Sequence, residues 1–307
     1  MRIKNFFSLR NSSFIIGLLL PITLAITLSL TAFHLQQKQE VQQKAKGVDV
    51  IAHTKVASTP SGQPPTPATT MGYPASDGHI YWSGDFETGD TSQWDGVHTG
   101  GKWGNSSIKT VTSPVRWGKY AGKFTVYGGG KYADRAEISA SQQQTGGYPG
   151  QEWYYSWSTY VPSIPNATSP WGFHADITQW MDLYHRCSPP LFVEILTGPP
   201  LQFNMQSDIL DNHNKCKSIG PHHEWNMGTF QYDQWNDFTV HIKWSEDPTV
   251  GFVEAWRNGV KVVPLTYMRT LDTSGGVYME QALYHPGNGG THVIYHDGTR
   301  RHDAYGG

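Results

Sequence analysis

Apolar and polar residues alternate along several short stretches of this chain. In the segment 237–245, DFTVHIKWS, the large apolar residues all occupy even-numbered positions, with polar residues between them. The segment 152–162, EWYYSWSTYVP, alternates aromatic with small polar residues in a similar way. Because successive side chains of a strand point to opposite faces, this period of two predicts strands with one buried face.

Turn signals separate these stretches. Asn258-Gly259 joins two short apolar runs in the segment 251–263, which is the pattern of a tight β-hairpin. Two further alternating segments, 275–285 and 290–298, follow toward the C-terminus. No segment combines a helical period with capping residues, and the chain contains 33 Gly and 19 Pro. The pattern predicts an all-β fold, an antiparallel sandwich of two sheets of the jelly-roll type.

The start of the chain differs in character from the rest. Residues 14–32 form an uncharged apolar run that follows Arg2, Lys4 and Arg10. This is the profile of a secretory signal peptide or of a signal anchor, and the run is about long enough to span a bilayer. No small-x-small cleavage site follows it, so both interpretations stay open. In either case we expect the remainder to be extracellular, secreted or anchored to the outer face of the cytoplasmic membrane.

A polar segment rich in Gln, Pro, Ser and Thr follows, and it cannot bury enough apolar surface to fold. We therefore expect a signal segment at 1–33, a disordered linker at 34–76 and one folded domain at 77–307. The formal net charge is −2 and only 16% of residues are charged, which argues against a nucleic-acid-binding surface. The 12 Trp and 16 Tyr suit the core of a sandwich, and some of them can stack on sugar rings.

The chain has two cysteines, Cys187 and Cys216. In an exported chain an even number favours a disulfide, here closing a loop of about 30 residues and stabilising the fold by roughly 3 kcal/mol. The alternative is a zinc site shared with histidines nearby in the sequence, namely His185, His213, His222 and His223. Their spacing matches no recognisable zinc motif, so the disulfide is favoured.

The segment 132–139, YADRAEIS, places two opposite charges on one face of a strand. Arg135 and Glu137 are two residues apart, so their side chains point the same way. In a chain with few charges such a pair needs an explanation, and a structural salt bridge at the surface is one.

Several pieces of the folded region resemble a known family. They are GDFETGDTSQW at 84–94, DRAEIS at 134–139, WYYSWSTYVP at 153–162, ITQW at 177–180, the segment 234–262, VYMEQALYH at 277–285 and THVIYHDGTRR at 291–301. In this order, and over most of residues 80–302, they resemble secreted polysaccharide lyases with a concanavalin-like jelly roll. That family is related to glucuronan lyase and more distantly to alginate and heparin lyases.

The resemblance implies β-elimination on a uronate-containing glycan. The uronate carboxylate must be neutralised, a base must remove the C5 proton, and an acid must protonate the departing glycosidic oxygen. Neutralisation needs donors such as Arg, Gln, Asn or a protonated carboxyl or imidazole group. A Tyr beside a cation suits both proton transfers.

The resemblance assigns roles to particular residues. Arg135 binds the carboxylate or tunes a Tyr, Glu137 orients Arg135, and Gln179 helps to neutralise the uronate. Tyr284 is the expected catalytic acid and base, and Tyr278 shares its strand face at the substrate. A structural role, as buried aromatic positions, is the alternative for both tyrosines.

The chain also departs from the family pattern. Met181 stands where relatives often carry a His, so either His174 or His185 replaces that imidazole or the Tyr performs both proton steps. Lys243 is a further candidate for substrate binding, although a solvated strand face explains it equally well. The usual Lys and Gly of the last motif are replaced by Glu280 and Ala282, which removes a cation near the tyrosine.

These departures keep two other functions open. One is a carbohydrate-binding jelly roll without catalysis, and the other is a glycoside hydrolase. A hydrolase needs two carboxylates, and the sequence offers only Glu254 without a recognisable partner. We expect no required cofactor; a structural calcium ion is possible, but no acidic loop is a persuasive site. The expected partner is an anionic polysaccharide bound by a monomer, with membrane contact only through the N-terminal segment.

Overall fold

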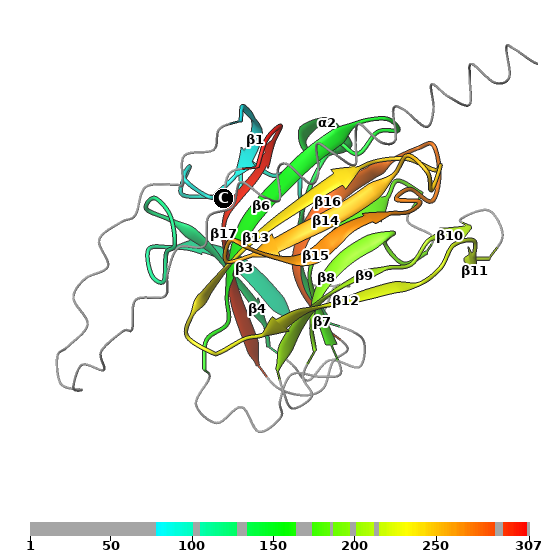
Figure 1. Ribbon diagram of the computed structural model, residues 1–307. Helices are drawn as coiled ribbons and strands as arrows, with labels where there is room; N and C mark the ends of the chain where they lie inside the picture. The colour runs from blue at the N-terminus through cyan, green and yellow to red at the C-terminus, as the bar shows by residue number, and fades with distance from the viewer. Residues whose placement is uncertain are drawn as a thin grey trace, which may run out of the picture. The chain divides into compact units, whose positions relative to one another are not determined.

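The computed structural model of the chain describes residues 78–100, 105–127, 134–163, 174–184, 187–196, 201–211, 215–285 and 291–305 (Figure 1). The expected signal segment and the whole of the expected linker lie outside these residues. Within the described ranges, no helix has the length and apolar character needed to cross a bilayer.

Strands in two antiparallel sheets make up almost all of the regular structure that is described. The eight-stranded sheet has the order β15-β14-β13-β6-β17-β4-β3, with β1 added to β17. Its strands are β1 Ile80–Gly84, β3 Ser106–Val111, β4 Ala121–Val126, β6 Glu152–Tyr160, β13 Trp235–Lys243, β14 Phe252–Arg257, β15 Val260–Tyr267 and β17 His292–His302.

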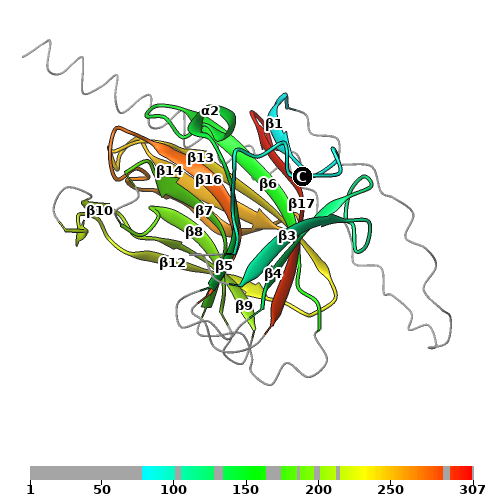
Figure 2. The same ribbon diagram turned by 180° about the vertical axis from the view of Figure 1, so that it is seen from behind.

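The seven-stranded sheet has the order β12-β9-β8-β7-β16-β5-β2 (Figure 2). Its strands are β2 Gly96–His98, β5 Asp134–Ala140, β7 His174–Asp182, β8 Leu191–Leu196, β9 Gln202–Ser207, β12 His223–Thr229 and β16 Val277–His285. A short pair, β10 Leu210–Asp211 and β11 Lys217–Ser218, and a one-turn helix, α2 Gln142–Thr145, complete the described elements. The all-β jelly-roll sandwich predicted from the sequence is confirmed.

Aromatic side chains from both sheets meet in the core. Tyr155 and Trp157 of β6 contact Trp180 of β7, with ring centroids 5.2 and 6.3 Å apart. Trp244, which follows β13, is fully buried beside them and donates its indole N–H to the Tyr155 hydroxyl at 3.0 Å. The alternation of the β6 and β13 segments therefore has the predicted cause, since every second side chain faces the other sheet.

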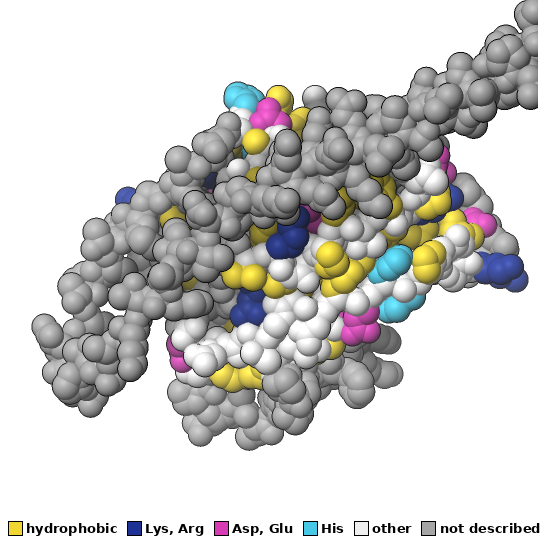
Figure 3. Space-filling view, in the orientation of Figure 1, with side chains coloured by type: hydrophobic (Ala, Val, Ile, Leu, Met, Phe, Trp, Pro, Cys, Tyr) yellow, Lys and Arg dark blue, Asp and Glu magenta, His cyan; other side chains and the backbone are white. Residues whose placement is uncertain are grey.

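Two local predictions are also confirmed. Asn258 and Gly259 both have positive φ, 51° and 76°, and they connect β14 to β15 as an antiparallel pair. Cys187 and Cys216 form a disulfide with Cα atoms 5.5 Å apart, so these thiols are not zinc ligands. On the face drawn in Figure 3, Lys and Arg side chains of the described residues are scattered among neutral ones, without a large basic patch.

Candidate active site

The candidate site lies on the outward face of the seven-stranded sheet, across β5, β16 and β7. In the antiparallel register, Arg135 of β5 lies opposite Tyr284 of β16, and Glu280 of β16 lies opposite Gln179 of β7. Directly opposite residues on one face have Cβ atoms about 4.5–5.5 Å apart. The register therefore brings residues from three distant parts of the sequence to one place, which we call the β5–β16–β7 face.

An irregularity in β7 decides which of its side chains reach this face. Ala175, Ile177 and Trp180 all belong to the hydrophobic core, so the strict alternation breaks between Ile177 and Trp180. The pairing of β7 with both neighbours shifts register at the same point. As a result Asp176 and Gln179, although three residues apart, both point away from the core.

Hydrogen bonds connect the side chains of this face into one network. Arg135 donates from Nη1 to Glu137 Oε1 at 3.1 Å. The Gln179 amide donates to Glu137 Oε2 at 3.3 Å and to Glu280 Oε2 at 2.5 Å. The Tyr278 hydroxyl donates to Glu280 Oε1 at 3.1 Å. Because Glu137, Gln179 and Glu280 are almost fully buried, the network holds each of them in a defined position.

The guanidinium of Arg135 also stacks on Tyr284. Its Cζ atom lies 4.4 Å from the centroid of the Tyr284 ring. Burial by itself would lower the pKa of Arg135, but Glu137 and its other negatively charged neighbours raise that pKa overall. Arg135 is therefore a fixed positive charge held between a buried carboxylate and a phenol.

Asp176 is a buried carboxyl group next to this pair. Asp176 lies opposite Tyr284 on β16 and opposite Glu194 on β8. Its side chain is 7% exposed, and its Oδ1 atom has no hydrogen-bond partner among the described residues. Burial, followed by the charges of Glu194 and Glu137, raises the pKa of Asp176 to about 8. Asp176 is therefore protonated at neutral pH and can donate a hydrogen bond.

Two further carboxyl groups of the same face hold protons more tightly than usual. Burial and the neighbouring Glu137 raise the pKa of Glu280 to about 7. Burial and Glu224 raise the pKa of Glu194 to about 6, although Gln206 donates a hydrogen bond that opposes this shift. The face thus loses negative charge as the pH falls from 8 to 6.

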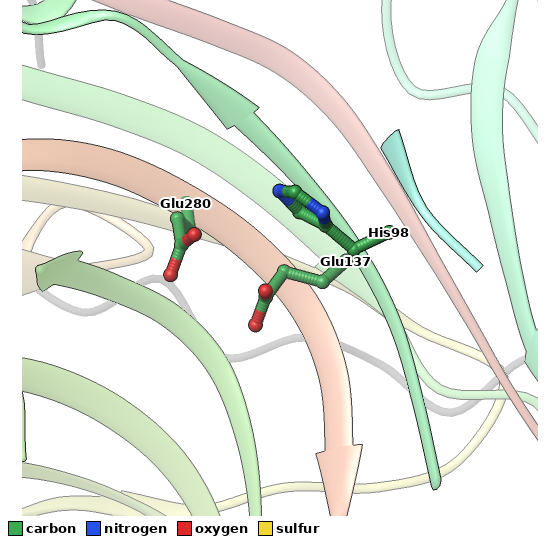
Figure 4. Close-up of side chains that lie close together, drawn as sticks. All are labelled: His98, Glu137 and Glu280. Atoms are coloured by element: carbon green, nitrogen blue, oxygen red, sulfur yellow. The ribbon is translucent and has the colours of Figure 1, made fainter. Parts of the chain in front are cut away.

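His98 of β2 lies at the edge of this network (Figure 4). It is opposite Glu137, and its ring nitrogen lies 3.4 Å from Ser139 Oγ. One potential ligand atom from each of His98, Glu137 and Glu280 lies within 4.8 Å of the others, a donor set of the kind that zinc accepts. Because the two carboxylates already accept hydrogen bonds from Arg135, Gln179 and Tyr278, we treat the three residues as part of the network.

The structure brings Arg135, Glu137, Gln179, Tyr278 and Tyr284 together on this face. Lys243 does not join them. It lies in β13 of the other sheet, where its Nζ atom is 3.3 Å from Glu152. The side chain of His174 and the whole of His185 lie outside the described residues.

Sequence reasoning missed Asp176, His98 and the pairing of Glu280 with Glu137. A period of two places Asp176 and Gln179 on opposite faces, so only the irregularity in β7 brings them to the same one. His98 stands in a three-residue strand with no local motif. The even spacing of Glu280 from Tyr278 and Tyr284 indicated that the three share a strand face. It could not indicate that Glu137, on the neighbouring strand β5, lies close to Glu280.

Comparisons with known proteins show the family of this chain and its fold. A family model described as polysaccharide lyase matches residues 86–300. An endo-β-1,4-glucuronan lyase from the fungus Trichoderma reesei has a similar structure, with 18% identity, coverage of 74% of this chain and 96% of that chain, and a TM-score of 0.58. That likeness shows the shared fold.

Two other solved structures are less similar. The marine alginate lyase from Aplysia kurodai has 11% identity, covers 73% of this chain and 98% of its own, and has a TM-score of 0.49. The catalytic domain of a family 131 glycoside hydrolase from Coprinopsis cinerea has 17% identity, covers 74% and 95%, and has a TM-score of 0.47. No curated protein matches the chain.

Proposed function

The chain belongs to the polysaccharide lyase family, and from this premise we propose that it cleaves a uronate-containing glycan by β-elimination on the β5–β16–β7 face. The observation that supports this proposal best is the connected arrangement of Arg135, Gln179 and Tyr284. A guanidinium, an amide and a phenol are the groups that this reaction needs. We further propose that the enzyme is secreted, which the Cys187–Cys216 disulfide supports.

Neutralisation of the uronate carboxylate is the first requirement, because it makes the C5 proton acidic enough to remove. Arg135 supplies the positive charge, and the Gln179 amide supplies a neutral donor when one of its two N–H groups exchanges its bond to Glu137 or Glu280 for one to the substrate. Asp176, protonated at neutral pH, supplies a further O–H donor from the neighbouring strand. Preorganised donors of this kind stabilise the negative charge that develops on the carboxylate as C5 loses its proton.

Tyr284 is our candidate for both proton transfers. As a phenolate it takes the C5 proton, the C5–H electrons form the C4–C5 double bond, and the C4–O4 bond breaks. The phenol then gives its proton to the departing O4, so no water is consumed. The Arg135 guanidinium over the ring stabilises the phenolate from which the reaction starts and to which Tyr284 returns after O4 has taken the proton.

The departures from the family pattern fit this division of roles. Met181 cannot carry a proton, which is why both proton steps are assigned to Tyr284. Glu280, in the position of the usual Lys, accepts hydrogen bonds from Gln179 and Tyr278 and so positions the amide. We propose that Glu280 is a positioning residue and that it does not itself transfer the proton.

The test is a screen of purified protein against a panel of uronate polysaccharides, followed by ultraviolet absorbance of the unsaturated product. Tyr284→Phe should abolish this product, because the ring stays in place and the transferable proton is lost. Tyr267→Phe, at an exposed tyrosine of the other sheet, is the matched control. Wild-type rates for Tyr284→Phe would refute the assignment of the catalytic group.

One observation favours glycoside hydrolysis as a second candidate. Glu137 and Glu280 are buried carboxyl groups with ligand atoms within 4.8 Å of each other, and the pKa of Glu280 is raised to about 7 by burial and by Glu137. Two carboxyl groups at short range, one of them with a raised pKa, are the arrangement of retaining hydrolases. New reducing ends without ultraviolet absorbance would identify this activity in the same screen.

A further inference from the structure

A cavity of about 330 Å³ lies on the eight-stranded sheet, away from the β5–β16–β7 face. Ser156, Trp157 and Ser158 of β6 are among its lining residues. The side chains of Tyr155 and Trp157 belong to the core, so the two serines, which alternate with them, point to the other side of the sheet. The cavity is therefore on the outer surface of this sheet. Its volume is within the range of small-molecule sites, roughly 300–1,000 Å³. Other lining residues are Ile80, Arg116, Trp117, Asn258, Gly259 and Tyr305.

A rigid guanidinium–carboxylate pair forms one side of the cavity. Arg116 donates from Nε and Nη2 to the two oxygens of Asp237 at 3.1 and 2.7 Å. Ser158 donates to Asp237 Oδ1 at 2.7 Å, and Trp117 donates from its indole to Ser158 at 3.0 Å. The side chains of Arg116 and Asp237 stay 25% and 33% exposed. A ligand can therefore reach a donor and an acceptor that are already held side by side.

Aromatic rings form the other sides. Trp256 of β14 and Tyr305 line the cavity with ring centroids 4.6 Å apart and planes inclined at 41°. Trp117 also lines the cavity, and the Arg116 guanidinium lies 4.6 Å from the centroid of its ring. Rings of this kind offer flat apolar surface against which the C–H groups of a sugar ring can pack.

The charges that line the cavity are balanced. Arg116 is paired with Asp237, and Arg300 lies 3.7 Å from Asp85. The Nδ1 atom of His302 lies 2.5 Å from the carbonyl oxygen of Ala304, and its Nε2 atom lies 3.1 Å from Ser156 Oγ. Burial lowers the pKa of His302. The histidine is therefore neutral at neutral pH. These groups therefore offer no excess positive charge to the carboxylate of a uronate ligand. The neighbouring hydroxyl groups of a neutral sugar can instead accept a hydrogen bond from the arginine and donate one to the aspartate.

We propose that this cavity is a second carbohydrate-binding site, which holds a neutral pyranose unit of a polysaccharide on the sheet opposite the lyase face. Vicinal hydroxyl groups bond to the Arg116–Asp237 pair, and the ring packs against Trp256 and Tyr305. Such a site would keep the enzyme on a neutral glycan while the other sheet acts on a uronate chain.

The experiment is calorimetric titration of the Tyr284→Phe protein, which removes the proposed cleavage, with cellohexaose, xylohexaose and mannohexaose. A hexameric glucuronan oligosaccharide is titrated in parallel. We expect at least one neutral hexasaccharide to bind. Removing the Tyr305 ring in the Tyr305→Ala variant should weaken this binding about tenfold. Tyr267→Ala removes an exposed tyrosine of the same sheet outside the cavity and should leave the affinity unchanged.

Lyase activity on the uronate substrate, measured with Tyr284 intact, should be the same with and without the Tyr305→Ala change. This measurement separates the two sites. If no uronate substrate is cleaved but a neutral hexasaccharide binds in the cavity, the proposed lyase function is wrong and the cavity proposal stands. Trp256→Leu is the second cavity variant, and thermal unfolding verifies that each variant is folded. The proposal is wrong if no neutral hexasaccharide binds at millimolar concentration, if both folded cavity variants keep full affinity, or if only the uronate hexasaccharide loses affinity.

Discussion

Replacement of Asp176 by asparagine should stabilise the protein, and the gain should grow with pH. The pKa of Asp176 rises from 3.8, the ordinary value of an aspartate, to about 8 in the folded protein, because of burial and then of Glu194 and Glu137. The folded state therefore keeps the proton up to about pH 8, whereas the unfolded chain releases it near pH 3.8. Between these values the unfolded state binds fewer protons, so folding becomes less favourable as the pH rises.

The expected magnitude follows from this difference. Each pH unit between about 4 and 8 costs the wild type roughly 1.4 kcal/mol of unfolding free energy, so the total is on the order of 5 kcal/mol. Asparagine has nearly the same shape and does not titrate. Asp176→Asn should therefore match the wild type near pH 4 and exceed it increasingly up to pH 8, beyond which the difference should stay constant.

The assay is urea unfolding followed by tryptophan fluorescence at pH 4, 6 and 8. Asp208→Asn, at an exposed carboxyl group paired with His222, is the control. The wild-type and Asp176→Asn curves should separate with pH, whereas the control should show no comparable separation. A constant difference between wild type and Asp176→Asn, or a lower stability of the variant at pH 8, would refute the claim that Asp176 is buried and protonated.

Two other results are expected. Glu280→Gln should reduce the rise in KM that we expect between about pH 6 and 8, because burial and Glu137 raise the pKa of Glu280 to about 7 and its ionisation adds negative charge to the uronate site. The part of the rise that comes from ionisation of Asp176 near pH 8 should remain in both proteins. Steady-state kinetics from pH 5 to 9 measure this, and an identical rise in both proteins would count against it. Replacing both cysteines, Cys187→Ser and Cys216→Ser, should lower the unfolding free energy by roughly 3 kcal/mol, because the disulfide closes a loop with a sequence separation of 29. Chemical denaturation measures this difference. An unchanged denaturation curve would show that the disulfide does not constrain the unfolded chain.

Much of the fold could be predicted from local patterns. The alternation in β6 and β13 identified strands, and the side chains at alternate positions do form the core between the sheets. Asn258-Gly259 identified the β14–β15 hairpin because these residues tolerate the positive φ of a tight turn. Arg135 and Glu137 were expected on one face from their spacing, and they form an ion pair there.

The candidate site was predictable only in part. The family motifs pointed to Arg135, Gln179 and Tyr284, but nothing local shows that β16 lies between β5 and β7. Lys243 fits a polar strand face in the sequence, yet β13 belongs to the other sheet and Glu152 binds the lysine. Glu254 was the acidic residue considered for a hydrolase, whereas the structure pairs Glu137 with Glu280.

The amino-acid sequence by itself determined which side chains each strand buries, where a tight turn forms and which chemical groups are present, because these depend on neighbours along the chain. Only the tertiary structure decided which groups meet. Strand order and register join residues more than a hundred positions apart, as with Gln179 and Glu280, and one irregularity in β7 moves Asp176 to the reactive face. The same packing removes water from the carboxyl groups, and that burial sets their protonation at neutral pH.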